Sequence, residues 1–128
     1  MTVIDSSALV ELVLDPALTR RSAHLLGEDV FAPALLIPES LNALKKQVAR
    51  KLITNQRATI AMQRIHAAPI DVVSMHSLTD QIWHLSGTFS TYDACYVALA
   101  KHLGLPLMTC DMRLASEAKK HVSVITPN

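Results

Sequence analysis

The sequence predicts an α/β fold with a central, mostly parallel sheet of four to five strands and helices on both faces. Short apolar runs alternate with segments of helical periodicity along almost the whole chain, which is typical of a parallel sheet. Half of the residues are apolar and only 18% are charged, which excludes a disordered chain. At 128 residues the chain has the size of one domain, so we expect a single domain over residues 1–128.

The first half of the chain is predicted to contain two strands and four helices. The strands are TVID at residues 2–5 and VFAP at 30–33, and helical patterns occupy residues 7–14, 17–27, 35–51 and 54–67. Gly27 is expected to close the second helix. Pro38 can occupy the first turn of the third, where its missing N–H costs nothing, and this places Glu39 near a helix start. In the fourth helix, Ile60 and Ile65 are expected on one apolar side.

The second half continues the alternation with three more strands and three more helices. The strands are predicted at residues 69–74, 106–110 and 122–126, and the helices at 76–87, 90–103 and 112–121. Gly87 and Gly104 are the expected ends of the first two of these helices.

The acidic residues are few, and their positions are therefore informative. Asp5 ends the first predicted strand, Asp111 directly follows the strand that contains LMTC, and Glu39 and Asp93 fall in the first turns of helices. In an open parallel sheet, the strand ends that feed helices lie at one edge, where such folds bind their ligands. We therefore expect the four carboxylates to converge at that edge.

Asp93 by itself has a simpler structural explanation. Ser90 can act as the N-cap of the helix with Asp93 at position N3, a variant of the capping box in which an acid favours the helix dipole. Caps do not need to converge, however, and several neighbouring carboxylates repel one another unless a cation neutralises them. Oxygen ligands without Cys or paired His suit Mg²⁺ or Mn²⁺. The expected chemistry is metal-assisted phosphoryl transfer.

Other catalytic and cofactor patterns are missing from the sequence. The six histidines form no H-E-x-x-H motif, no serine lies in a G-x-S-x-G elbow, and the three glycines are too scattered for a phosphate-binding loop. Two cysteines, Cys95 and Cys110, have no C-x-x-C spacing and are expected to be reduced. No apolar run reaches the roughly 18 residues of a membrane span, and acids near the start argue against a secretory signal. These features favour a cytoplasmic protein.

A basic cluster follows Glu39 along the same predicted helix, at Lys45, Lys46, Arg50 and Lys51. Such a charge run is often only a solvated helix face. Near a metal site it could instead hold a phosphate backbone, a contact that supplies affinity without reading sequence. The net charge of +1 does not by itself indicate a nucleic-acid-binding protein.

Four segments together resemble the PIN-domain ribonucleases, and among them the VapC-type toxins of toxin-antitoxin pairs. They are VIDSSALVEL at residues 3–12, PESLNALKK at 38–46, TYDACYVALA at 91–100 and LMTCDMRLA at 107–115. Each segment alone is weak evidence, but their order and spacing in a chain of this length are specific. The resemblance covers essentially the whole chain and implies a PIN-like fold.

The resemblance implies a Mg²⁺- or Mn²⁺-dependent endoribonuclease, the toxin component of a type II toxin-antitoxin system. It places the catalytic and metal-binding acids at Asp5, Glu39, Asp93 and Asp111, and supporting hydroxyls at Ser6, Ser90 and Thr109. It also implies an RNA substrate, a homodimer and a cognate antitoxin protein whose C-terminal segment occupies the active-site groove. Some relatives carry a further acid close behind the position of Asp111, where this chain has Met112, Arg113 and Leu114, so the resemblance does not fix the number of metal ions.

Two other functions are considered. A phosphoacceptor receiver domain would have similar size, alternation and edge acids, but it needs a pair of acids after the first strand and a late lysine. Here Asp5 is followed by Ser6 and Ser7. The second alternative is a PIN-like binding module that has lost catalysis, against which the presence of all four acids argues.

Overall fold

The computed structural model describes all residues, 1 to 128, and contains one five-stranded sheet in which every neighbouring pair of strands is parallel. The strand order is β3-β2-β1-β4-β5, and the strands are β1 (Thr2–Ile4), β2 (Val30–Pro33), β3 (Ile70–Val73), β4 (Leu107–Met108) and β5 (Val124–Ile125). The predicted α/β class and the parallel sheet are confirmed.

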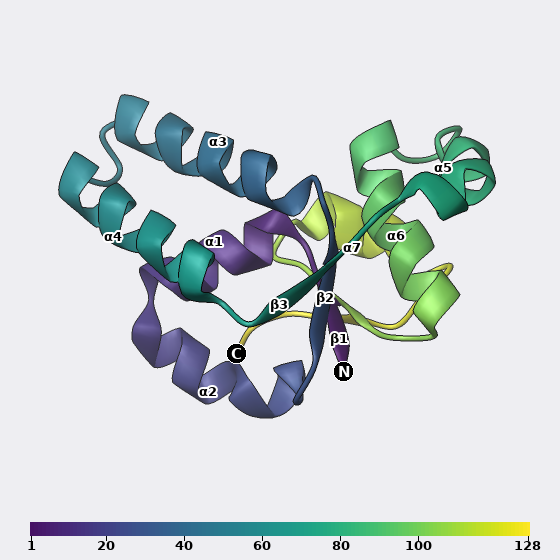
Figure 1. Ribbon diagram of the computed structural model, residues 1–128, viewed down its shortest axis with the longest axis horizontal. Helices are drawn as coiled ribbons and strands as arrows, with labels where there is room; N and C mark the ends of the chain where they lie inside the picture. Colours follow the sequence, from purple (N-terminus) through teal and green to yellow (C-terminus); the bar gives the residue numbers. More distant parts are fainter.

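Helices connect successive strands and flank the sheet on two sides (Figure 1). They are α1 (Ser6–Leu14), α2 (Pro16–Leu26), α3 (Leu36–Ala49), α4 (Asn55–Ala67), α5 (Thr79–Leu85), α6 (Thr91–Leu103) and α7 (Met112–Ala118), with a short 3₁₀ turn, η1 (His76–Leu78), before α5. In Figure 1, α1 to α4 lie to the left of the strands, and α5 and α6 lie to the right. No helix is both long and apolar enough to cross a bilayer.

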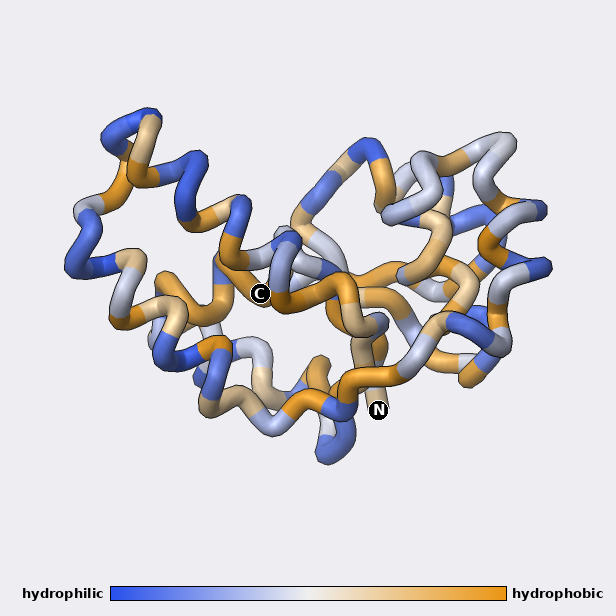
Figure 2. Tube along the Cα trace, turned by 45° about the horizontal axis from the view of Figure 1, so that its top comes forward, coloured by the Kyte–Doolittle hydropathy of each residue, from blue (hydrophilic) through white to orange (hydrophobic).

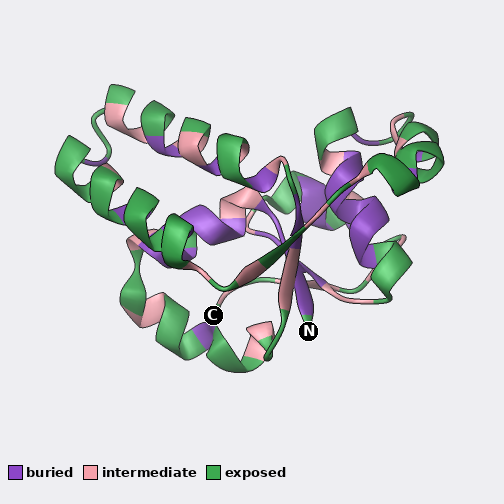
Figure 3. Ribbon diagram, viewed as in Figure 1, coloured by how far each residue is buried: buried purple, intermediate pink, exposed green.

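The core is built around the central strand and one helix that is buried almost all round. β1 is buried at every position, and α6 is buried without interruption from Ala94 to Ala100 (Figure 3). α6 contacts β1, β2 and β4, so it lies across the middle of the sheet. The small side chains of Ala94 and Ala98 permit this close approach. The rigid, buried helix that the sequence predicts behind Asp93 is therefore present.

The C-terminal strands are shorter than predicted. The segments at residues 106–110 and 122–126 each contribute only two residues of regular strand, because only Leu107 and Met108 pair with Val124 and Ile125. The helix predicted over residues 76–87 is divided into η1 and α5, and α7 ends three residues before its predicted end at His121. These differences concern element ends and leave the order of elements unchanged.

The α3 and α4 helices form an antiparallel arm whose apolar face covers α1. Figure 2 shows alternating hydrophilic and hydrophobic colouring along this arm, as expected for amphipathic helices. The prediction for α4 was wrong for Ile60, which is 40% exposed, whereas Ala61 and Ile65 are buried. Arg64 donates a hydrogen bond of 2.7 Å to the Val13 carbonyl, and this bond satisfies a carbonyl in the last turn of α1.

Candidate active site

The four predicted acids lie at the same edge of the sheet. Asp5 directly follows β1 and is the N-cap of α1, and Asp111 follows β4 and is the N-cap of α7. β1 and β4 are parallel neighbours with Ile4 opposite Met108, so these two acids leave adjacent strands at the same end. Glu39 and Asp93 lie in the first turns of α3 and α6. The predicted edge placement is confirmed.

Asp5 is the most deeply buried of the four carboxylates, with 4% of its surface exposed. Its Oδ1 accepts hydrogen bonds from the Ala8 backbone N–H at 2.9 Å and from the Ser7 hydroxyl at 2.7 Å. Its Oδ2 accepts a hydrogen bond from the Thr109 hydroxyl. Burial raises the pKa of Asp5, and the negative charge of Asp111 raises it further, while these hydrogen bonds oppose the rise.

Thr109 and Ser7 join the ends of β1 and β4 through hydrogen bonds between residues more than 100 positions apart. Thr109 Oγ1 accepts a bond of 3.0 Å from the Asp111 backbone N–H, and Ser7 Oγ accepts one of 2.9 Å from the Cys110 N–H. The two hydroxyl oxygens lie 3.2 Å apart. This network holds Asp5 and the backbone of Asp111 in one rigid unit. Thr109 was expected as a supporting residue, whereas sequence reasoning missed Ser7.

Glu39 is held through one of its two carboxylate oxygens. Its Oε1 accepts hydrogen bonds of 2.8 Å from the Ser6 hydroxyl and of 2.8 Å from the Tyr96 phenol. No protein donor reaches Oε2. Tyr96 is another residue that sequence reasoning missed, although it follows Asp93 by three positions and therefore lies near the same face of its helix.

Asp93 is half-buried, and the Ser90 side chain lies near enough to its carboxylate to lower the pKa of Asp93 through a hydrogen bond. The cap of α6 is supplied by Ser90, whose Oγ accepts a bond of 3.1 Å from the Asp93 backbone N–H, as predicted. The reciprocal bond of a capping box, from the Asp93 carboxylate to the Ser90 N–H, is not formed. Burial raises the pKa of Asp93 most, and the negative charges of Asp111 and Glu39 raise it further. The Asp93 carboxylate therefore does not cap α6.

Asp111 combines an exposed position with a structural role. Its Oδ1 accepts bonds from the backbone N–H groups of Arg113 at 3.0 Å and Leu114 at 3.2 Å, which caps α7. Its Oδ2 has no protein donor. The side chain of Arg113 is a further feature of this edge, because its positive charge lowers the pKa of Asp93.

The carboxylates act on one another electrostatically without forming a closed ligand set. No three His, Cys, Asp or Glu side chains lie close enough together to hold one metal ion between them. The expectation that the four carboxylates converge was therefore wrong at ligating distance, although all four lie at the same edge; Asp5 and Asp111 each accept hydrogen bonds from their own helix. The oxygens without protein donors include Oε2 of Glu39 and Oδ2 of Asp111. An all-oxygen set with uncompensated negative charge fits Mg²⁺ or Mn²⁺.

The predicted RNA-binding cluster lies apart from the carboxylates. Lys45, Lys46, Arg50 and Lys51 are exposed and form no ion pair, but they occupy the far half of α3 and the turn after it. At 1.5 Å per residue they lie roughly 9 to 18 Å beyond Glu39 along the helix. The structure therefore places these four cations on the arm rather than beside the acids.

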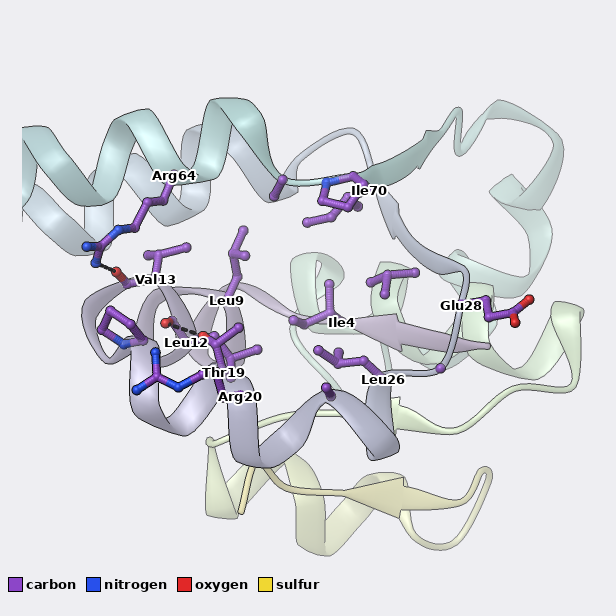
Figure 4. Close-up of a pocket in the computed structure, with 16 residues that line it drawn as sticks. Ile4, Leu9, Leu12, Val13, Thr19, Arg20, Leu26, Glu28, Arg64 and Ile70 are labelled. Atoms are coloured by element: carbon purple, nitrogen blue, oxygen red, sulfur yellow. Dashed lines mark hydrogen bonds between the residues drawn. The ribbon is translucent and has the colours of Figure 1, made fainter.

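A cavity of about 550 Å³ lies on another part of the molecule (Figure 4). It is lined mainly by apolar side chains of α1, α2 and the β1 and β3 strands, including Leu9, Leu12 and Ile70, with Arg20 and Arg64 at one end. None of the four acids lines it. The candidate active site is therefore the carboxylate edge and not this cavity.

The sequence matches the PIN domain family over residues 2–120, almost the whole chain. The chain belongs to the PIN-domain family. Ribonuclease VapC12 of Mycobacterium tuberculosis is 38% identical to this PIN domain over 116 residues, which cover 90% of each chain. Ribonuclease VapC1 of the same species is 36% identical over 120 residues, covering 89% of this chain and 88% of the relative. The predicted resemblance to VapC-type ribonucleases is confirmed.

Solved structures support the same fold for this PIN domain. PAE2754 from Pyrobaculum aerophilum has a TM-score of 0.72 at 24% identity, with coverage of 98% of this chain and 89% of that one. VapBC2 from Rickettsia felis, solved with a promoter DNA fragment, has a TM-score of 0.69 at 9% identity and covers both chains completely. A receiver domain is excluded, because the strand order 3-2-1-4-5 differs from the 2-1-3-4-5 order of that fold.

Proposed function

We propose that this PIN domain, over residues 1–128, is a Mg²⁺- or Mn²⁺-dependent endoribonuclease and the toxin of a type II toxin-antitoxin pair. The observation that supports it most is the set of carboxylates on one sheet edge, whose oxygens are partly free. Burial raises the pKa of Asp5 and Asp93, and repulsion by neighbouring carboxylates raises it further. A bound divalent cation would relieve this repulsion. The identity to VapC-type ribonucleases over 90% of the chain supports RNA as the substrate.

Asp5, Glu39, Asp93 and Asp111 are the residues that would hold the cation, with water completing its ligand set, because no three of them lie close enough in this structure to hold it by themselves. A bound ion would activate water and offset charge that develops on the phosphate. The protein contributes rigidity, because Asp5 is anchored by the Thr109 and Ser7 hydroxyls. The buried helix α6 presents Asp93.

Supporting hydroxyls and cations complete the proposal. Ser6 holds Glu39, and Ser90 caps the helix that carries Asp93. We assign the exposed Lys45, Lys46, Arg50 and Lys51 to the RNA backbone away from the scissile phosphate, since α3 carries Glu39 in its first turn and leads from there to these cations. Hydrolysis would leave 5′-phosphate and 3′-hydroxyl ends.

We further propose that the protein acts in the cytoplasm as a homodimer and is inhibited by a cognate antitoxin. Solved relatives in complexes, such as FitAB and VapBC2, support the existence of a partner protein. Light scattering of the purified chain tests the dimer. Co-expression with the protein encoded beside it, followed by co-purification and loss of cleavage, tests the antitoxin.

The decisive experiment is cleavage of a mixed cellular RNA pool by the purified protein with Mg²⁺ or Mn²⁺. EDTA and the Asp93→Asn variant serve as controls, because the Asp93 carboxylate does not supply the helix cap and its loss should leave the helix intact. Discrete cuts with 5′-phosphate ends, lost in both controls, are expected. RNA binding without cleavage by folded, antitoxin-free protein would instead favour the alternative, a PIN-like binding module.

A further inference from the structure

A buried phenol joins two of the helices that carry the candidate ligands. Tyr96 lies in α6, three residues after Asp93, and only 1% of its surface is exposed. Its hydroxyl donates a 2.8 Å hydrogen bond to Oε1 of Glu39, which belongs to α3. The two residues are 57 positions apart in the sequence. The bond therefore sets the position of the Glu39 carboxylate relative to the helix that carries Asp93.

We propose that Tyr96 is a positioning residue, which holds Oε1 of Glu39 so that Oε2 is available to the cation. The proposal rests on the metal-dependent function proposed above. Ser6 and Tyr96 both donate to Oε1, at 2.8 Å each, and no protein donor reaches Oε2. Glu39 is thus anchored through one oxygen, to α1 at Ser6, directly after Asp5, and to α6 at Tyr96, three residues after Asp93.

The phenol is suited to act as a permanent donor. A buried tyrosine hydroxyl needs a hydrogen-bond partner, and Glu39 is the acceptor to which it donates here. The Tyr96 ring is packed in the core, which leaves the hydroxyl little freedom to turn away.

Loss of this bond is expected to loosen one metal ligand while preserving the others. In Tyr96→Phe the ring still fills its place in the core, but Glu39 retains only the Ser6 donor. Removing a group that orients a metal ligand typically weakens metal binding by about 10- to 100-fold. Because Ser6 still holds Oε1, we expect the effect near the lower end, about tenfold.

Tyr92→Phe is a matched control on the same helix. It removes the same phenolic oxygen one turn earlier, from a side chain that is 66% exposed and makes no side-chain hydrogen bond. We would measure the Mn²⁺ dissociation constant of wild type, Tyr96→Phe and Tyr92→Phe by calorimetry, with thermal unfolding as a check of the fold. The Mn²⁺ concentration for half-maximal cleavage would be measured in parallel with kcat at saturating Mn²⁺.

A tenfold weaker Mn²⁺ affinity in Tyr96→Phe alone, with most of kcat recovered at saturating Mn²⁺, would support the positioning role. Equal affinities in the two variants would overturn it and leave the metal site intact, even if Tyr96→Phe were less stable. Absence of Mn²⁺ binding by wild type would overturn the metal site and the positioning role together. If Tyr96→Phe does not fold, Ser6→Ala tests the same anchor from its other donor, and an unchanged affinity there would refute the one-oxygen anchor.

Discussion

Replacing Thr109 by Val should destabilise the protein, and by more at neutral than at acidic pH. The two side chains have nearly the same shape, and Thr109 is fully buried, so the change removes a hydroxyl without opening a cavity. That hydroxyl donates to Asp5 Oδ2 and accepts from the Asp111 N–H at 3.0 Å. The substitution therefore takes one donor from a buried carboxylate and one acceptor from a backbone N–H.

The expected loss follows from these two bonds. A hydrogen bond to a charged group contributes about 1.5 to 3 kcal/mol, and a neutral one contributes about 1 kcal/mol. The free energy of unfolding should therefore fall by roughly 2.5 to 4 kcal/mol at pH 7. For a domain of this size, about 4 °C of Tm per kcal/mol converts this to a decrease of roughly 10 to 16 °C.

The pH dependence has a defined sign. Burial raises the pKa of Asp5 above 3.8, and the Thr109 bond is the strongest of the effects that lower it, so Thr109→Val raises this pKa further. At a pH well above the Asp5 pKa of both proteins, the carboxylate is charged in each, and the full loss of unfolding free energy is present. As the pH falls through the higher pKa of the variant, its Asp5 is protonated first and the difference between the proteins shrinks.

Urea unfolding at pH 7 and near pH 5, without divalent cations, measures both effects. Thr59→Val is the control, because Thr59 is exposed and donates only to the Asn55 carbonyl of its own helix, at 3.0 Å. We expect the control to change the free energy of unfolding by less than about 0.5 kcal/mol. Equal losses in the two variants, or a Thr109→Val loss that grows as the pH falls, would refute the role assigned to the Asp5 network.

Three further outcomes are expected. Ser90→Ala should lower the free energy of unfolding by about 1 kcal/mol through loss of the α6 cap, with recovery in Ser90→Asp, as measured by urea unfolding. Gly27→Ala should lower the free energy of unfolding by more than about 1 kcal/mol, because Gly27 has φ of 74° and an added Cβ would meet the Met1 backbone nitrogen. Gly87→Ala should leave the free energy of unfolding nearly unchanged, since nothing lies within 4 Å of its Cβ position. Thermal unfolding of the two variants tests this difference. Mn²⁺ affinity should fall as the pH is lowered toward the raised pKa of Asp93, by up to about tenfold per pH unit for each proton that competes with the ion. Calorimetry at several pH values measures this, and an affinity that does not change with pH would contradict a carboxylate site.

The order of the elements and the place of each acid were determined by local features of the sequence. Apolar period, the Ser90 cap and the Gly27 and Gly104 helix ends act over a few residues, and all of them are present in the structure. Because strands that feed helices in a parallel sheet end at one edge, Asp5 and Asp111 could be assigned to that edge before any contact was known.

Contacts between distant segments were decided only by the tertiary structure. The bonds from Tyr96 to Glu39 and from Thr109 to Asp5 join residues 57 and 104 positions apart, and no periodicity encodes such pairs. The length of β4 and β5 was likewise decided by which residues of the two strands meet. Strand ends and hydrogen-bond partners depend on long-range packing, whereas helix periodicity does not.

The distances among the charged groups were the last property that the sequence left open. It placed four acids on one edge and a basic cluster on the following helix, but their separation depends on how far α3 extends from the sheet. Only the structure shows that Lys45 and its neighbours lie along the arm, and that no three acids are within shared ligating distance. The physical reason is that each acid lies at the start of a different helix, so their spacing follows from how those helices pack.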